Sequence, residues 1–227
     1  MKRKRQAFTL AEVLITLGII GVIAALTMPI LIKSYQNKQK SVALKRVYST
    51  LQQALIMSQQ EHGDTNIWER FPYHMNGSLD WSNEYIFKYV KKVTACEGGN
   101  SELGCPSEAD KICRPDGSCH STNLKAAMYV LSSGETIYLY GGGNPDANFK
   151  TSYIHVLVDI NGIKSPNQYG KDVFAFTISL EDSVSFDAFG GNLSSRTELL
   201  TGCKEDPQKC AALVRYDDWE FKRDYPW

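Results

Sequence analysis

The first part of the chain carries two hydrophobic patterns in succession. In residues 8–32, Glu12 is the one charged residue in an otherwise apolar or weakly polar segment. A helix of that length spans about 37 Å, which exceeds the roughly 30 Å hydrocarbon core of a bilayer. The segment is therefore predicted to cross a membrane as a single helix.

In the next segment, residues 33–62, the apolar positions contract to one stripe. Its members recur every three or four residues, the period of an amphipathic helix packed on a globular domain: Leu44, Tyr48, Leu51 and Leu55. Gly63 suits the left-handed cap that ends a helix. Pro29 lacks a backbone donor and is predicted to kink the helix within its apolar half.

Residues 63–227 have the pattern of a small globular domain. Apolar runs predict antiparallel strands, the first two joined by a hairpin turn, at residues 127–131, 136–140, 153–160 and 173–180. A second, short helix is predicted at residues 81–93. The predicted class is α+β, with the long N-terminal helix packed on a small antiparallel sheet whose loops bear cysteines.

Charge separates the N-terminus from the rest. The chain has 25 basic and 25 acidic residues, and this balance argues against a nucleic-acid partner. Residues 2–5 are all basic and precede the apolar segment, so they are predicted to stay in the cytoplasm. Without residues 1–7 the chain keeps 21 basic and 25 acidic residues, which marks that stretch as a separate leader.

Glu12 needs an explanation, because a carboxylate near the end of a membrane helix costs up to about 2–3 kcal/mol. The small residue Ala7 lies before the apolar run, whereas a secretory signal has its cleavage site after a shorter run. Cleavage between Ala7 and Phe8 would leave an α-amino group that Glu12 of the same or a neighbouring chain could meet. The alternative is a simple membrane anchor with an incidental acid.

The basic leader, Ala7 and the order Phe8-Thr9-Leu10-Ala11-Glu12 resemble the class III signal of type IV pilins and type II secretion pseudopilins. The resemblance implies that prepilin peptidase cuts before Phe8 and methylates the new amine. It also implies that Glu12 guides the subunit into a helical filament. The usual residue before the cut is glycine, and the residue before the glutamate is usually isoleucine or valine; this chain has alanine at both positions.

The same resemblance implies a pilin-like fold, and Pro29 lies where many members of the family carry a helix-bending proline. It implies a single pass through the bacterial inner membrane, with the head in the periplasm or outside, and a cell-surface filament after assembly. The implied partners are prepilin peptidase, further copies of the chain, other pilin-like subunits and the inner-membrane assembly machinery.

The cysteines all lie in the predicted head: Cys96, Cys105, Cys113, Cys119, Cys203 and Cys210. An even number in the loops of an exported domain favours three disulfides. Cys203 and Cys210 are the favoured pair because they close one local loop far from the others, and the pairing of the other four stays open. Zinc is disfavoured, since no C-x-x-C spacing occurs.

The loop between the last two predicted strands carries oxygen-bearing side chains of the kind that Ca²⁺ uses: Asp159, Asn161, Asn167 and Asp172. Calcium is one interpretation, although Lys164 stands where an EF-hand loop needs glycine. The alternative is a turn in which the two carboxylates accept hydrogen bonds from loop amides. This stretch, Asp-Ile-Asn-Gly followed by Pro-Asn and Gly-Lys-Asp-Val-Phe, also resembles pseudopilin-like proteins.

The expected function is therefore assembly rather than catalysis. The histidines are scattered and no G-x-S-x-G motif occurs, so the chain is not expected to be an enzyme. The first hypothesis is a structural subunit of a type IV pilus-like filament or a type II secretion pseudopilus. The alternative is a membrane-anchored or tip-located subunit that recognises cargo, sugar or DNA through its head.

Overall fold

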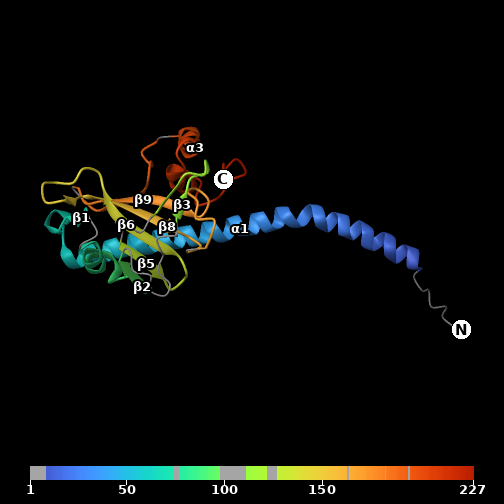
Figure 1. The fold of residues 1–227 in the computed structure, drawn as a ribbon, viewed down its shortest axis with the longest axis horizontal. Helices are drawn as coiled ribbons and strands as arrows, with labels where there is room; N and C mark the ends of the chain where they lie inside the picture. The colour runs from blue at the N-terminus through green and yellow to red at the C-terminus, as the bar shows by residue number, and fades with distance from the viewer. Residues whose placement is uncertain are drawn as a thin grey trace. The chain divides into compact units, whose positions relative to one another are not determined.

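The computed structural model describes residues 9–73, 77–97, 111–121, 127–162, 164–181, 183–193 and 195–227. The chain divides into two compact units, Met1–Gln39 and Lys40–Trp227, and each is described by itself. The helix α1 (Leu10–His62) supplies residues to both units (Figure 1).

In the first unit, α1 presents apolar side chains to its surroundings on every side. Leu10, Leu17 and Ile30 are 78%, 60% and 71% exposed. None of the most apolar stretch of α1 is buried within the described residues, and the helix is long and apolar enough to cross a membrane. The helix continues through Pro29.

In the second unit, α1 buries the predicted stripe. Its buried residues are Leu44, Val47, Tyr48, Leu51, Ala54, Leu55 and Ser58. Burying one leucine side chain contributes about 1.5–3 kcal/mol, so this stripe is a large part of the hydrophobic core. The helix ends as the sequence predicts, because Gly63 has φ of 75° and its N–H donates to the carbonyl of Gln59 at 2.9 Å.

An antiparallel sheet of six strands covers this part of α1 (Figure 1). The strand order across the sheet is β10 (Ser185–Ala188), β9 (Val173–Ser179), β8 (Tyr153–Asp159), β6 (Thr136–Gly142), β5 (Ala127–Leu131) and β2 (Lys92–Glu97). The four predicted strands are therefore confirmed as β5, β6, β8 and β9. The edge strands β2 and β10 were not predicted.

The sheet buries both of its faces, as the alternation of side chains along a strand allows. Val156 and Phe176 are paired across β8 and β9 and belong to the core that includes the α1 stripe. The next pair, Leu157 and Ala175, belongs to a second cluster that includes Tyr169. The described members of the second cluster include no residue of α1; Ile112 of β3 (Lys111–Cys113) and Tyr169 of the loop of residues 159–172 pack on this face of the sheet instead.

The predicted helix at residues 81–93 is wrong in its bounds. The structure has α2 (Ser78–Ser82), a π-helical turn η2 (Asn83–Phe87) and then the strand β2. The apolar residues of this stretch fit a helical period, but the helical turns end at Phe87, and the last two residues of the predicted helix belong to β2, which pairs with β5. Tertiary pairing of this kind is not visible in a local pattern.

The remaining elements are short. They are η1 (Thr65–Ile67), the paired strands β1 (Phe71–Pro72) and β7 (Lys150–Thr151), the paired strands β3 (Lys111–Cys113) and β4 (Cys119–Ser121), α3 (Arg196–Glu205), η3 (Pro207–Lys209) and α4 (Cys210–Tyr216). A capping box starts α3, in which Ser195 and Glu198 each accept the other's backbone N–H.

Candidate functional site

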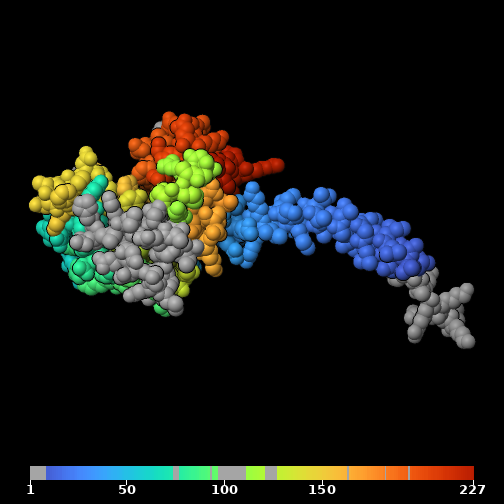
Figure 2. All heavy atoms as spheres, viewed as in Figure 1, coloured from blue at the N-terminus to red at the C-terminus, as the bar shows by residue number. Residues whose placement is uncertain are grey.

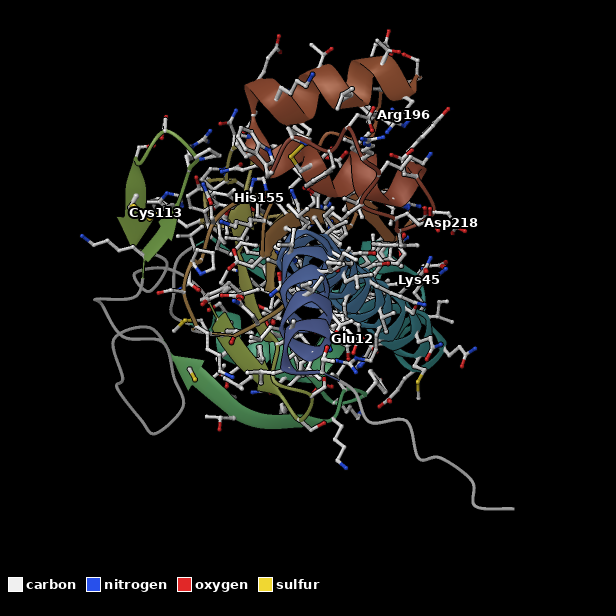
Figure 3. All side chains as sticks on the ribbon, turned by 90° about the vertical axis from the view of Figure 1, so that its right-hand side faces the viewer. Glu12, Lys45, Cys113, His155, Arg196 and Asp218 are labelled. Carbon is white, nitrogen blue, oxygen red and sulfur yellow. A yellow bond between two sulfur atoms is a disulfide. The ribbon has the colours of Figure 1, made fainter. Side chains whose placement is uncertain are left out.

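The first turn of α1 places Glu12 in a capping box with Thr9. The N–H and the hydroxyl of Thr9 each donate to Oε2 of Glu12 at 2.8 Å, and the N–H of Glu12 donates to Oγ1 of Thr9 at 3.3 Å. This pairing satisfies donors that the start of a helix otherwise leaves open. Ala7 and Phe8, the residues at the predicted cleavage point, lie outside the described residues. Figure 3 shows Glu12 at this end of α1.

The C-terminal residues are packed against α1 in the second unit. The ring of Trp219 lies 4.8 Å from the ring of Tyr48, and the hydroxyl of Ser41 donates to the carbonyl of Trp219. Lys45 and Asp218 form an exposed ion pair at 3.5 Å, visible in Figure 3. Aromatic packing and a hydrogen bond to α1 therefore hold the C-terminal tail on the second unit.

A buried carboxylate, Asp217, anchors the same tail through charged groups. Arg196 approaches it with two nitrogens, Nε at 2.7 Å and Nη2 at 2.8 Å, and Lys222 donates to it at 2.7 Å. Burial would raise the pKa of Asp217, but the hydrogen bonds from Arg196 and Lys222 outweigh it, so the pKa lies below its ordinary value. Arg196 also binds Asp224, whose pKa it lowers to about 2.

The described cysteines are oxidised. Disulfides join Cys113 to Cys119, across the ends of β3 and β4, and Cys203 to Cys210, between α3 and α4. The second of these is the pair that the sequence favours. Cys96 is also disulfide-bonded, and Cys105 lies outside the described residues.

The loop between β8 and β9, residues 159–172, contacts three distant segments of the second unit. The carbonyl of Lys171 accepts from Nζ of Lys40 on α1 at 2.9 Å, and the carbonyl of Asn167 accepts from the N–H of Cys113 at 2.8 Å. The hydroxyl of Tyr225 donates to the carbonyl of Gly170. Figure 2 shows the β3–β4 hairpin (light green), this part of the chain (orange) and the C-terminal segments (red) on one face.

Within this loop the two aspartates have different surroundings. Asp172 accepts from the N–H of Gln168 at 2.6 Å, from the N–H of Asn167 at 3.0 Å and from Nδ2 of Asn161 at 3.2 Å. Asp159 accepts from the N–H of Asn161 at 3.2 Å through Oδ1, while its Oδ2 is buried without a hydrogen-bond partner among the described residues.

Both carboxyl groups are inside the protein, and this changes their acidity. Burial, followed by repulsion from Asp172, raises the pKa of Asp159 to about 8. Burial also raises the pKa of Asp172, against the hydrogen bond from Gln168 and the charge of Lys40.

The structure thus brings Asp159, Asn161 and Asp172 into one hydrogen-bonded network, which Asn167 joins through its backbone. Among the described residues no group of three or more histidine, cysteine and carboxylate side chains could hold a metal, so any cation here would also need the amide oxygens.

A separate cavity of about 570 Å³ lies beside α2, η2 and β7. Its walls include the rings of Trp81, Tyr85 and Phe149 and the charged groups of Asp80, Glu84 and Lys150. Trp81 and Tyr85 lie against each other, with ring centroids 4.7 Å apart. This cavity combines aromatic surface with acidic groups, and it could not be found from the sequence because its walls come from separated segments.

His155 and His120 are packed rather than arranged for catalysis. His155 lies in β8 between the rings of Tyr140 and Phe189, at 5.2 and 5.6 Å, and burial lowers its pKa. His120 shares a hydrogen bond of 3.1 Å with the hydroxyl of Tyr169. Neither is described beside a nucleophile or a carboxylate that would orient it as a general base.

Two protein-family models match consecutive parts of the chain. Residues 2–28 match the prokaryotic N-terminal methylation motif. Together with the long apolar helix and the antiparallel head, this motif defines a type IV pilin-like protein. Within that class the chain belongs to a family of unknown function (DUF6613), whose model matches residues 30–227. No curated protein and no solved structure matches the chain.

Proposed function

We propose that this chain is a structural subunit of a type IV pilus-like filament or a type II secretion pseudopilus, without catalytic activity of its own. The observation that supports the proposal most is the start of α1. There, one carboxylate near the N-terminus precedes a stretch that is apolar on all sides and unburied within the described residues. Such a helix is stable only where lipid or other apolar helices surround it.

The proposed assembly step uses the carboxylate of Glu12. Prepilin peptidase would free and methylate the amine of Phe8, and Glu12 would pair with that amine on a neighbouring subunit. The capping box does not compete with this pairing, because its hydrogen bonds to Thr9 use Oε2 and not Oε1. In an apolar surrounding a charge pair is stronger than in water, so it can align one subunit on the next.

Mass analysis of the N-terminal peptide, taken from purified membranes and from sheared filaments, tests the proposal. The expected peptide begins at Phe8 and carries one methyl group on its amine. Assembled material that still begins at Met1 would contradict the proposed maturation. The partners and their arrangement would follow from cross-linking the assembled form.

A second candidate function is capture of a cationic group in the cavity beside α2. Its carboxylates exceed its cations, since Glu69 is paired with Lys150 while Asp80 and Glu84 add further negative charge. The aromatic walls could hold a cation by its attraction to ring faces. Titration of the full chain in detergent with arginine amide, followed through the indole NMR signal of Trp81, tests this function. An unchanged signal would remove it and leave the filament role intact.

A further inference from the structure

The cavity beside α2 has a wall of aromatic rings that the fold holds in place. The ring centroids of Trp81 and Tyr85 are 4.7 Å apart, and those of Trp68 and Tyr85 are 4.8 Å apart in a stacked pair. The indole N–H of Trp81 donates to the carbonyl of Glu69 at 2.6 Å, and the N–H of Glu69 donates to the hydroxyl of Tyr85 at 3.2 Å. The wall is therefore set before a ligand arrives, which lowers the entropic cost of binding.

A further aromatic side chain borders the cavity from the segment before β7. Phe149 is 59% exposed, although phenylalanine is among the residues most often buried. Its N–H donates to the carbonyl of Asp146 at 3.0 Å, and its carbonyl accepts from the N–H of Tyr73 at 2.8 Å. The backbone of Phe149 is thus held from both sides while its ring stays accessible to a ligand.

The charges that line the cavity are mostly negative. Glu69 is paired with Lys150, whereas Asp80 and Glu84 form no ion pair with a lysine or an arginine among the described residues. Asp80 is exposed and the side chain of Glu84 is 57% exposed, so both can meet a ligand. The described walls carry three carboxylates and one ammonium group, and a positively charged ligand fits them.

The size and the walls of the cavity indicate which cation fits. Its volume of about 570 Å³ lies within the roughly 300–1000 Å³ of sites that enclose a small ligand, so it admits more than an ammonium group. A guanidinium group is planar, stacks on aromatic faces and forks onto carboxylates, whereas an ammonium group is a strongly hydrated point charge. An aromatic wall beside two carboxylates therefore favours arginine over lysine.

His62, the last residue of α1, lies beside this wall. Its ring centroid is 4.9 Å from that of Tyr85, and its Nε2 is 3.7 Å from Oε1 of Glu84. Nε2 of His62 is buried and has no hydrogen-bond partner among the described residues. A proton on this atom would therefore face one of the two carboxylates that make the cavity negative.

The other groups around His62 allow a positive charge there. The ring of Trp68, 6.1 Å away, is uncharged, and Glu61 on the same helix is negative and paired with Lys88. The carbonyl groups at the end of a helix also favour a cation. Histidine is the side chain that changes its charge between pH 5 and 8. On acidification, a positive His62 would draw Glu84 into an ion pair and reduce the negative charge of the cavity.

We propose that the cavity beside α2 binds an arginine side chain of another polypeptide, and that a proton on His62 weakens this binding. The inference rests on the proposed capture of a cationic group, to which it adds the class of ligand and the dependence on pH. It does not depend on the filament role. Capture near neutral pH and release in a more acidic medium make the contact reversible.

Titration of the full chain in detergent with N-acetylarginine amide, followed through the indole NMR signal of Trp81, tests the ligand class. N-acetylcitrulline amide is the matched probe, because a neutral urea group of similar shape replaces the guanidinium group. At about pH 7.5 the arginine amide should bind at least about tenfold more tightly than the citrulline amide, and more tightly than N-acetyllysine amide. At about pH 5.5 the affinity for the arginine amide should fall at least about threefold.

Two variants assign the pH dependence to its residues. In His62→Gln, which cannot take up the charge, the affinity for the arginine amide should be the same at both pH values. Glu84→Gln should bind more weakly than the native chain near neutral pH and should also lose the pH dependence. Asp64→Asn is the matched control, because Asp64 is an exposed acid close to His62 in the chain but is not among the described walls of the cavity. It should keep both the affinity and its pH dependence.

The outcomes separate this inference from the proposed capture. Failure of both the arginine and the lysine amide to bind near neutral pH would overturn the two together, as would equal binding of the citrulline amide. Equal binding of the lysine amide would leave capture of a cation intact and overturn the assignment to arginine. An affinity that is the same at both pH values, or a pH dependence that persists in His62→Gln, would overturn the role of His62 alone.

Discussion

The two parts of α1 form one continuous helix but differ in whether this chain buries their apolar side chains. In the first unit, Leu17 and Ile30 are mostly exposed and the helix has apolar residues on all faces. In the second unit, Leu51 is 1% exposed and only one face is apolar. Here the apolar face of the helix is buried against the sheet of the same chain.

This difference shows where the chain needs partners. Apolar surface that the chain leaves open must be covered by lipid or by other subunits, because its exposure to water costs about 25 cal/mol per Å². Surface that the chain covers itself contributes to the stability of the unit instead. Changes in the first unit should therefore alter assembly, and changes in the second should alter folding.

The largest effect on assembly is expected from Glu12→Gln, measured by co-assembly of tagged native and variant subunits. Glutamine can still serve in a capping box with Thr9, but it has no charge to pair with an amine. Cleavage and membrane insertion should proceed, while incorporation should fall at least about tenfold, which corresponds to a loss of roughly 1.4 kcal/mol of pairing. Glu12→Ala should behave in the same way.

Thr9→Val is the matched control for that experiment. It removes the hydroxyl that bonds to Glu12 and leaves the acid in place. Incorporation near the native level is expected. If Glu12→Gln assembled normally while Glu12→Ala and Thr9→Val did not, Glu12 would act through the helix cap and not through its charge.

A pair of identical substitutions in α1 tests the comparison directly. Leu51→Ala should destabilise the chain by about 2–5 kcal/mol, because it leaves a cavity between α1 and the sheet. Leu17→Ala should change the unfolding free energy by less than about 0.5 kcal/mol, because Leu17 is 60% exposed within this chain. Denaturant unfolding of the full chain in detergent measures both. Similar losses in the two variants would show that the first unit contributes to the folded core.

Much of the fold could be predicted because its patterns are local. The periodicity of apolar residues predicts the stripe from Leu44 to Leu55 and the strands of the β5–β6 hairpin. Gly63 predicts where α1 ends. The strand β2 and the small sheets could not be found in this way, since their conformation depends on partners far along the chain. The Thr9–Glu12 cap was present in the sequence as a Thr-x-x-Glu spacing and was missed.

The loop of residues 159–172 shows the same division. Its four oxygen-bearing residues could be named from the sequence, because side-chain chemistry is local. The sequence left their roles open between a calcium site and a turn in which the carboxylates accept from loop amides, and the structure shows Asp159 and Asp172 accepting such hydrogen bonds. The cavity beside α2 was beyond prediction, since its walls come from segments between Glu69 and Lys150.

A smaller effect is expected from the disulfides, and the two bonds should differ. Each closes a short loop, with sequence separations of 7 and 6, and should contribute about 2–3 kcal/mol by restricting the unfolded chain. Cys203 and Cys210 are fully buried, whereas Cys119 is exposed. Graded reduction followed by alkylation and mass analysis should therefore modify Cys119 before Cys203. The reverse order would show that the contact between α3 and α4 opens more readily than the hairpin.

The smallest effect is expected from Asp217→Asn, and it should depend on pH. The pKa of Asp217 is lowered in the folded chain, so its contribution to stability is present above its ordinary value near 3.8 and is lost as the pH falls through the folded value. At pH 7 the variant should be less stable by about 1.5–3 kcal/mol, the value of a hydrogen bond to a charged group. The difference from the native chain should shrink below about pH 4.

Asp187→Asn is the control, because its ion pair with Arg215 is exposed and worth at most about 1 kcal/mol. Equal losses in the two variants at pH 7 would mean that the buried pair with Arg196 contributes no more than a surface ion pair.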